Sequence, residues 1–208
     1  MLPLINKGQK NDLTKDLQII KSIKYIFNLN IIRHLFIIML AIAILIFGLE
    51  TLSPVIAKDI FNTGPTGFGI LLSSAGFGMA VASLTIASLK SININKLLTI
   101  SIAGGGLTLI AFSFSPNYLV GIMLFAVLFS LAAASESAIT TMIQTSVPDN
   151  MRGKVISIQT FTWGISSLTG ILSGYISEQF GITLLIFISG IILFTLTPIT
   201  RLIAKETK

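Results

Sequence analysis

The sequence lacks several residue types on which many functional sites depend. It has no cysteine and a single histidine, His34, which excludes disulfides, thiolate metal sites and histidine metal clusters. Charged residues make up only 11% of the chain, whereas ordinary soluble domains carry about 25%. No Ser/His/Asp set, nucleotide-binding loop or metal-ligand spacing is present, so the sequence gives little support to an enzyme or to a cofactor.

The chain is instead rich in hydrophobic residues. Hydrophobic residues make up 53% of it, and its mean hydropathy is +0.91. A soluble protein of this composition would expose large apolar patches and aggregate, so the composition indicates a membrane protein. The net charge of +6 would suggest nucleic-acid binding in a soluble protein. Here the positions of the charges favour a lipid bilayer as the partner, and no nucleic acid is expected.

Six long apolar stretches predict an all-α membrane protein with six transmembrane helices. Each stretch reaches or nearly reaches the roughly 20 residues that a spanning helix needs. Glycine, proline and asparagine between the stretches supply turns, as in "NTGPTG" (62–67) and "SFSPN" (113–117). The predicted spans lie near residues 34–57, 67–89, 96–114, 118–146, 155–177 and 182–204.

Lysine and arginine predict the orientation. With six spans, thirteen of these cations fall on the side of the two termini, and only Lys58 falls on the other side. Cytoplasmic loops are enriched in lysine and arginine. We therefore expect both termini, including the tail at 205–208, to be cytoplasmic, and the agreement supports the number of spans.

Residues 1–33 are polar and basic and form a predicted cytoplasmic linker. Apolar residues recur within it at helical spacing, which is typical of an amphipathic helix on a membrane surface. The alternative is a solvated linker, since Lys24 falls on the apolar face. The apolar positions are Leu13, Leu17, Ile20, Ile23 and Phe27.

Glu50 is an acidic residue inside the first predicted span, in the segment "LIFGLETLSPVIA" (45–57). An ionised carboxylate in hydrocarbon costs several kcal/mol, and intramembrane ionisable groups are functional by default. Glu50 is therefore a candidate proton-binding or substrate-binding residue that faces a water-filled cavity. The alternative is that it lies close enough to the outer surface to be wetted, near Lys58.

Glu136 is the second carboxylate deep in a span, in "LAAASESAITTMIQTS" (131–146). Small and polar residues share its face at helical spacing, as expected of a helix that lines a cavity or packs closely. We predict a proton-binding or substrate-binding role for Glu136, with Thr140 and Gln144 lining the cavity. The alternative is a hydrogen bond from Glu136 to a neighbouring helix within a tightly packed bundle.

Two further features have structural or functional interpretations. Gly164, Gly170 and Gly174 in the fifth span predict close helix packing. The segment "SVPDNMRGKV" (146–155) is interpreted as a cytoplasmic gate loop containing Asp149, Arg152 and Gly153. In it, Arg152 would cap the carbonyl end of a helix or pair with a carboxylate. The alternative is a plain positive-inside anchor.

Several segments together resemble the C-terminal half of a major facilitator superfamily transporter. "LQIIKSIKYIFNLNIIRHLF" (17–36) looks like the central linker entering the seventh helix, and "IQTSVPDNMRGKVISI" (143–158) is similar to the loop between the tenth and eleventh helices. "LSPVIAKDIFNTGPTGFGILLSSAGFGMAVAS" (52–83) and "GISSLTGILSGYISEQFG" (164–181) resemble the remaining characteristic regions. The nearest resemblance is to bacterial drug and siderophore exporters of the macrolide efflux and enterobactin exporter type. One departure is "SLTG" (167–170), where many relatives have a proline before the glycine.

The resemblance implies one six-helix half of a transporter that works by alternating access, with its substrate site between two halves. In such a family the first and fourth helices of each half line the cavity, and these carry Glu50 and Glu136. A small-molecule substrate, export across a bacterial cytoplasmic membrane, proton coupling and a second half would follow. That half could be a separate chain or a second copy. The alternative is a truncated, non-transporting fragment or a six-span structural protein.

Overall fold

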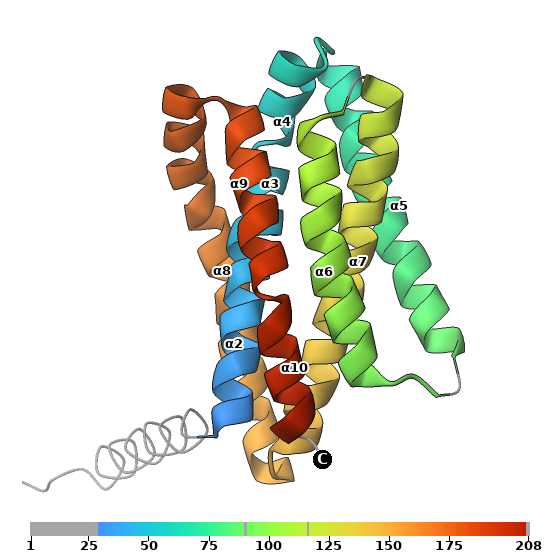
Figure 1. The fold of residues 1–208 in the computed structure, drawn as a ribbon, viewed down its shortest axis with the longest axis vertical. Helices are drawn as coiled ribbons and strands as arrows, with labels where there is room; N and C mark the ends of the chain where they lie inside the picture. The colour runs from blue at the N-terminus through green and yellow to red at the C-terminus, as the bar shows by residue number, and fades with distance from the viewer. Residues whose placement is uncertain (1–28, 90, 116, 207–208) are drawn as a thin grey trace, which may run out of the picture.

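The computed structural model describes residues 29–89, 91–115 and 117–206, and this part of the chain is a bundle of long helices (Figure 1). The predicted amphipathic helix at Leu13 to Phe27 lies outside the described residues. The first rod is built from α2 (Asn30–Ile42), η1 (Ala43–Phe47), α3 (Gly48–Thr51), α4 (Ser53–Val55) and η2 (Ile56–Ile60). It is followed by α5 (Pro65–Ser88), α6 (Ile94–Ser113), α7 (Tyr118–Ser146), α8 (Asp149–Phe180), α9 (Ile182–Thr195) and α10 (Thr197–Glu206).

Local sequence explains where these helices begin and end. Asn93 and Asn117 cap α6 and α7, because each side chain accepts a hydrogen bond of 3.0 Å from the backbone N–H three residues later. Pro65 occupies the first position of α5, where its missing N–H is harmless. Gly181 separates α8 from α9 with φ of 84°, a conformation that glycine adopts without strain.

Five helical segments among the described residues are long and apolar enough to cross a membrane. They are Asn30–Thr51, Pro65–Ser88, Ile94–Ser113, Tyr118–Ser146 and Ile182–Ala204. The remaining predicted span corresponds to α8, whose 32 residues give a helix of about 48 Å at 1.5 Å per residue. The all-helical membrane architecture is thus confirmed for the described residues, while a sixth span at α8 stays a prediction.

The helix α8 begins earlier than expected. The gate segment at 147–154 was expected to be a loop, but only Val147 and Pro148 separate α7 from α8. Asp149, Arg152 and Gly153 therefore lie in the first turns of a helix. Asp149 stands in the first turn of α8, where a carboxylate is favoured by the helix dipole.

In the bundle α5, α6 and α7 lie on one side and α8 on the other, α9 packs directly against α6, and the first rod contacts both α7 and α8 (Figure 1). The start of α2 and the end of α10 lie at the same end, together with the α5–α6 and α7–α8 connections. Arg33, Lys96, Arg152 and Arg201 belong to helix segments at that end, whereas Lys58 in η2 belongs to the opposite end. The separation of charge that the sequence predicts is therefore present in space, and cytoplasmic termini remain the prediction that it supports.

Close contacts at glycines and between aromatic rings hold the helices together. A Cβ at Gly106 of α6 would lie 2.9 Å from the carbonyl oxygen of Gly190 in α9, so the two backbones cross in close contact. Phe129 of α7 packs against Phe47 of the first rod, with ring centroids 5.9 Å apart in an edge-to-face arrangement. Phe129 also lies 4.8 Å from the ring of Phe125. The contact between Phe47 and Phe129 fixes the first rod against α7, seven residues before Glu136.

Candidate functional site: two cavities at Glu136

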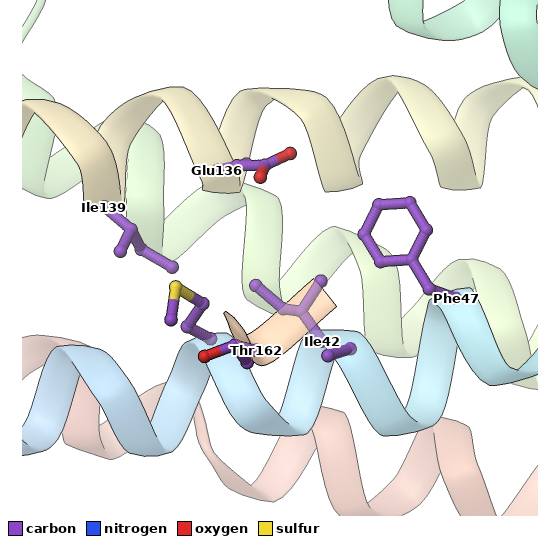
Figure 2. Close-up of a pocket in the computed structure, with 7 residues that line it drawn as sticks. Ile42, Phe47, Glu136, Ile139 and Thr162 are labelled. Atoms are coloured by element: carbon purple, nitrogen blue, oxygen red, sulfur yellow. The ribbon is translucent and has the colours of Figure 1, made fainter. Parts of the chain in front are cut away.

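Glu136 lines a small, partly open cavity and also a wider groove. The small cavity has a volume of about 20 Å³, which is room for about one water molecule. It lies between the first rod, α7 and α8, and Figure 2 shows Glu136 on α7 across from Ile42 and Thr162, with Phe47 nearby. The full lining is Met39, Ile42, Ala43, Phe47, Glu136, Ile139 and Thr162.

The open groove on the other side of Glu136 is wide and polar. It has a volume of about 400 Å³ and lies between α5 and α7. Hydroxyl groups line it from both helices, and those of Ser83 and Thr141 donate to the backbone carbonyls of Met79 and Ser137. Its lining is Met79 and Ser83 from α5 with Ala133, Glu136, Ser137, Thr140 and Thr141 from α7.

The predicted site residue Thr140 lies in this groove and also joins α7 to α8. The amide Nε2 of Gln159 donates a hydrogen bond of 2.5 Å to Thr140 Oγ1, and the Gln159 side chain is buried. Sequence reasoning missed Gln159 and Thr162, although polar side chains in the middle of an apolar stretch are a usable signal. Thr140 therefore contacts both the groove and the helix that closes the small cavity.

Gln144 has a different place from the one expected. It is not among the residues that line either cavity at Glu136. Its backbone carbonyl accepts a hydrogen bond of 2.9 Å from Nε of Arg152. Arg152 thereby satisfies one of the open carbonyls near the end of α7, so the structure ties Gln144 to the helix junction through its backbone.

Arg152 makes both of the contacts that were considered for it. Besides the bond to Gln144, its Nη1 lies 2.9 Å from Oδ1 of Asp149. Both side chains are well exposed, so the ion pair adds little stability by itself. Its effect is geometric: the pair orients Arg152 against the end of α7. At Gly153 an added Cβ would have no neighbour within 4 Å among the described atoms.

Glu50 lies apart from Glu136. It is half-buried in the short helix α3, and it lines neither cavity at Glu136. The small cavity is lined by residues of the first rod up to Phe47, and Glu50 follows three residues later, about 4.5 Å farther along at 1.5 Å per residue. The two carboxylates therefore do not share a cavity.

The backbone around Glu50 is irregular. The π-helical segments η1 and η2 stand on either side of it, and the helix is interrupted at Leu52, just before Pro54. The hydroxyl of Ser53 donates a 2.5 Å hydrogen bond to the carbonyl oxygen of Glu50. Short π-helical turns are rare and occur frequently at functional sites.

The three glycines predicted to pack in α8 differ from one another. A Cβ at Gly170 would lie 2.5 Å from Cγ2 of Thr51, so α8 and α3 touch there. Gly164 and Gly174 have no atom of the described chain within 4 Å of an added Cβ. Close packing within the chain therefore occurs at Gly170, and packing at Gly164 and Gly174 would need a surface from outside it.

Within the described residues, no three histidine, cysteine, aspartate or glutamate side chains lie close enough to hold a metal ion. The chemistry on offer at Glu136 is therefore that of a carboxylate, several hydroxyls and one amide. Such groups can hold a proton, a cation or a hydrogen-bonding solute.

Comparison with known proteins identifies the family of the chain. Residues 35–208 match the family model described as Major Facilitator Superfamily. Searches of curated proteins and of solved structures each returned no significant match. Members of this family are transporters rather than enzymes, and the apolar helices support a multi-pass membrane protein. The chain belongs to the major facilitator superfamily of membrane transporters.

Proposed function

We propose that the chain forms one half of an exporter that moves a small molecule by alternating access, and that Glu136 binds the coupling proton or a cationic group of the substrate. One observation carries this proposal. Glu136 lines both the small cavity next to the first rod and the wider groove between α5 and α7. A carboxylate with access to both spaces can pass a proton or cation from one to the other, as alternating access requires.

The groove also supports a second half as partner. An ionised carboxylate at Glu136 would be costly against lipid tails, whereas the hydroxyls of Ser83 and Thr141 already donate to backbone carbonyls of their own helices. A second six-helix half, supplied by another chain or by a second copy of this one, would cover the groove. Gly164 and Gly174 leave open space on α8 for such a surface. The charge distribution favours cytoplasmic termini, and the resemblance to bacterial exporters implies the bacterial cytoplasmic membrane as the location.

Glu50 has a separate role in this proposal. It would bind a proton or substrate group nearer the outer face, in a rod whose π-helical turns permit local rearrangement. Asp149, Arg152 and Gly153 would form the gate at the opposite end, because Arg152 joins the start of α8 to the end of α7. A movement of α8 relative to α7 would break that bond.

The test is transport by the chain together with any partner half, reconstituted in vesicles with a pH gradient and a panel of cationic dyes. Glu136→Gln should strongly reduce gradient-driven dye movement, because the amide neither binds a proton at neutral pH nor carries charge. Glu178→Gln is the matched control, since Glu178 is an exposed carboxylate near the end of α8. Wild-type rates in Glu136→Gln would refute the role of Glu136. A strictly monomeric wild-type chain that transports by itself would refute the second half.

A further inference from the structure

A groove outside the proposed transport site lies between α6 and α10, at the end of the bundle where α2 begins. Its volume is about 240 Å³. Two exposed cations from different helices line it, Lys96 from α6 and Arg201 from α10. The rest of its lining is neutral, so no acidic side chain of the lining offsets the two positive charges. The neutral residues are Asn95, Thr99, Ile100 and Ala204.

The two sides of this groove are fixed relative to each other. The hydroxyls of Thr99 in α6 and Thr200 in α10 lie 2.9 Å apart in a hydrogen bond. Asn93 caps the first turn of α6 through the backbone N–H of Lys96. The backbone positions of Lys96 and Arg201 are therefore held by α6 and α10, and both side chains line the same groove.

An apolar stripe leads from the groove along α6. Ile100, Leu107 and Phe114 follow Lys96 at intervals of four and seven residues, which places them on one face of the helix. Their side chains are 65%, 55% and 69% exposed. At the far end, Phe114 contacts Phe187 of α9 with ring centroids 5.4 Å apart. The surface thus has a cationic end near the start of α6 and an apolar stripe that runs along the length of this helix.

We infer that this surface binds an anionic phospholipid, with the phosphate between Lys96 and Arg201 and an acyl chain along the stripe. Basic pockets between membrane helices suit anionic headgroups, and basic residues attract such lipids. A free phosphate would use the two cations but would leave the apolar stripe unused. The lipid is therefore the ligand that satisfies both parts of the surface.

The experiment is native mass spectrometry of the purified full chain in neutral detergent, titrated with phosphatidylglycerol or with phosphatidylcholine. Phosphatidylglycerol should bind more tightly than phosphatidylcholine. The double variant Lys96→Gln with Arg201→Gln should weaken phosphatidylglycerol binding about 25-fold, because each cation contributes about fivefold. Lys58→Gln is the matched control, because Lys58 is an exposed lysine that lines a groove at the opposite end. Lys96→Arg with Arg201→Lys should retain the preference and shows that the fold tolerates changes at both positions.

Two further arms separate the sources of phosphate and test the stripe. Glycerol phosphate should not displace the lipid at concentrations equal to that of the lipid, and Ile100→Ser should weaken phosphatidylglycerol binding. Equal binding of the two lipids, or equal losses in the double variant and in Lys58→Gln, would overturn the inference. Displacement by glycerol phosphate would overturn it in favour of a simple phosphate site.

Discussion

The first rod and α7 each carry one intramembrane carboxylate, but they are built differently. The helix α7 runs without interruption for 29 residues from its Asn117 cap. The first rod is divided by two π-helical segments and by the interruption at Leu52. A continuous helix fixes the direction of each side chain, so Glu136 has one defined place between its two cavities. The interrupted rod places Glu50 beside a backbone that small changes in hydrogen bonding can rearrange.

This difference indicates that α7 and the first rod have different roles in the bundle. The helix α7 contacts α5, α6 and the first rod and contributes to both cavities at Glu136. The first rod contacts α7 through Phe47 and contacts α8 through Gly48 and Thr51. We therefore expect changes in α7 to alter stability and binding, and changes around Glu50 to alter the movement between states.

Mutation of the contact between the first rod and α7 should lower the free energy of unfolding the most. Phe129→Ala removes a fully buried ring that packs on Phe47, and large-to-small core changes of this kind cost about 4 kcal/mol. Denaturation in mixed micelles measures the loss. Met123→Ala on the same helix is the control, since Met123 is largely exposed. Equal losses of unfolding free energy in Phe129→Ala and Met123→Ala would show that the Phe47–Phe129 contact does not hold the first rod against α7.

The two carboxylates should respond differently to neutralisation. Glu136→Gln should reduce gradient-driven transport about 100-fold, the size of a strong coupling free energy between two binding events. Glu50→Gln should reduce transport less, because Glu50 lines neither cavity at Glu136. Transport rates of the two variants in vesicles show which carboxylate contributes more to transport. A greater loss in Glu50→Gln would reverse the assignment of the main binding site.

Glycine substitutions in α8 test the contact of that helix with α3. Gly170→Leu places a side chain where Thr51 already lies, and overpacking costs about 2 kcal/mol. Gly174→Leu is the matched change four residues later, at a position with open space in the described chain. Unfolding of the isolated chain should be affected only by the first substitution. If Gly174→Leu instead disrupts assembly with a second half, the proposed interface gains support.

The smallest expected effect concerns the polar bond between α7 and α8. Thr140→Val and Gln159→Leu each remove one partner of the 2.5 Å hydrogen bond, and each should cost about 1 kcal/mol. The double variant should cost less than the sum, because both single changes leave a polar partner without its bond. Thermal unfolding of all four proteins completes the cycle, and strict additivity would contradict a direct bond.

Much of the fold could be predicted from local sequence. The apolar stretches predicted the all-helical membrane architecture, since hydropathy depends only on neighbours in the chain. The segment expected to be a gate loop is instead the start of α8, where Asp149 pairs with Arg152 and Arg152 reaches the end of α7. Of the site, Glu136 and Thr140 were found through their charge or polarity and their helical spacing. Gln159 and Thr162 were missed, since nothing local shows which neighbour an α8 side chain meets.

The sequence by itself determined that this is a helical membrane protein with its cations gathered at one end. Composition, hydropathy and the spacing of lysine and arginine are properties of the chain alone, and the bilayer acts on them directly. Only the tertiary structure decided that Glu136 lies between two cavities, that Glu50 lies apart, and that Lys96 and Arg201 share a groove. Those relations depend on how each helix is rotated and which helices cross, and close contacts between distant residues such as Gly106 and Gly190 set both.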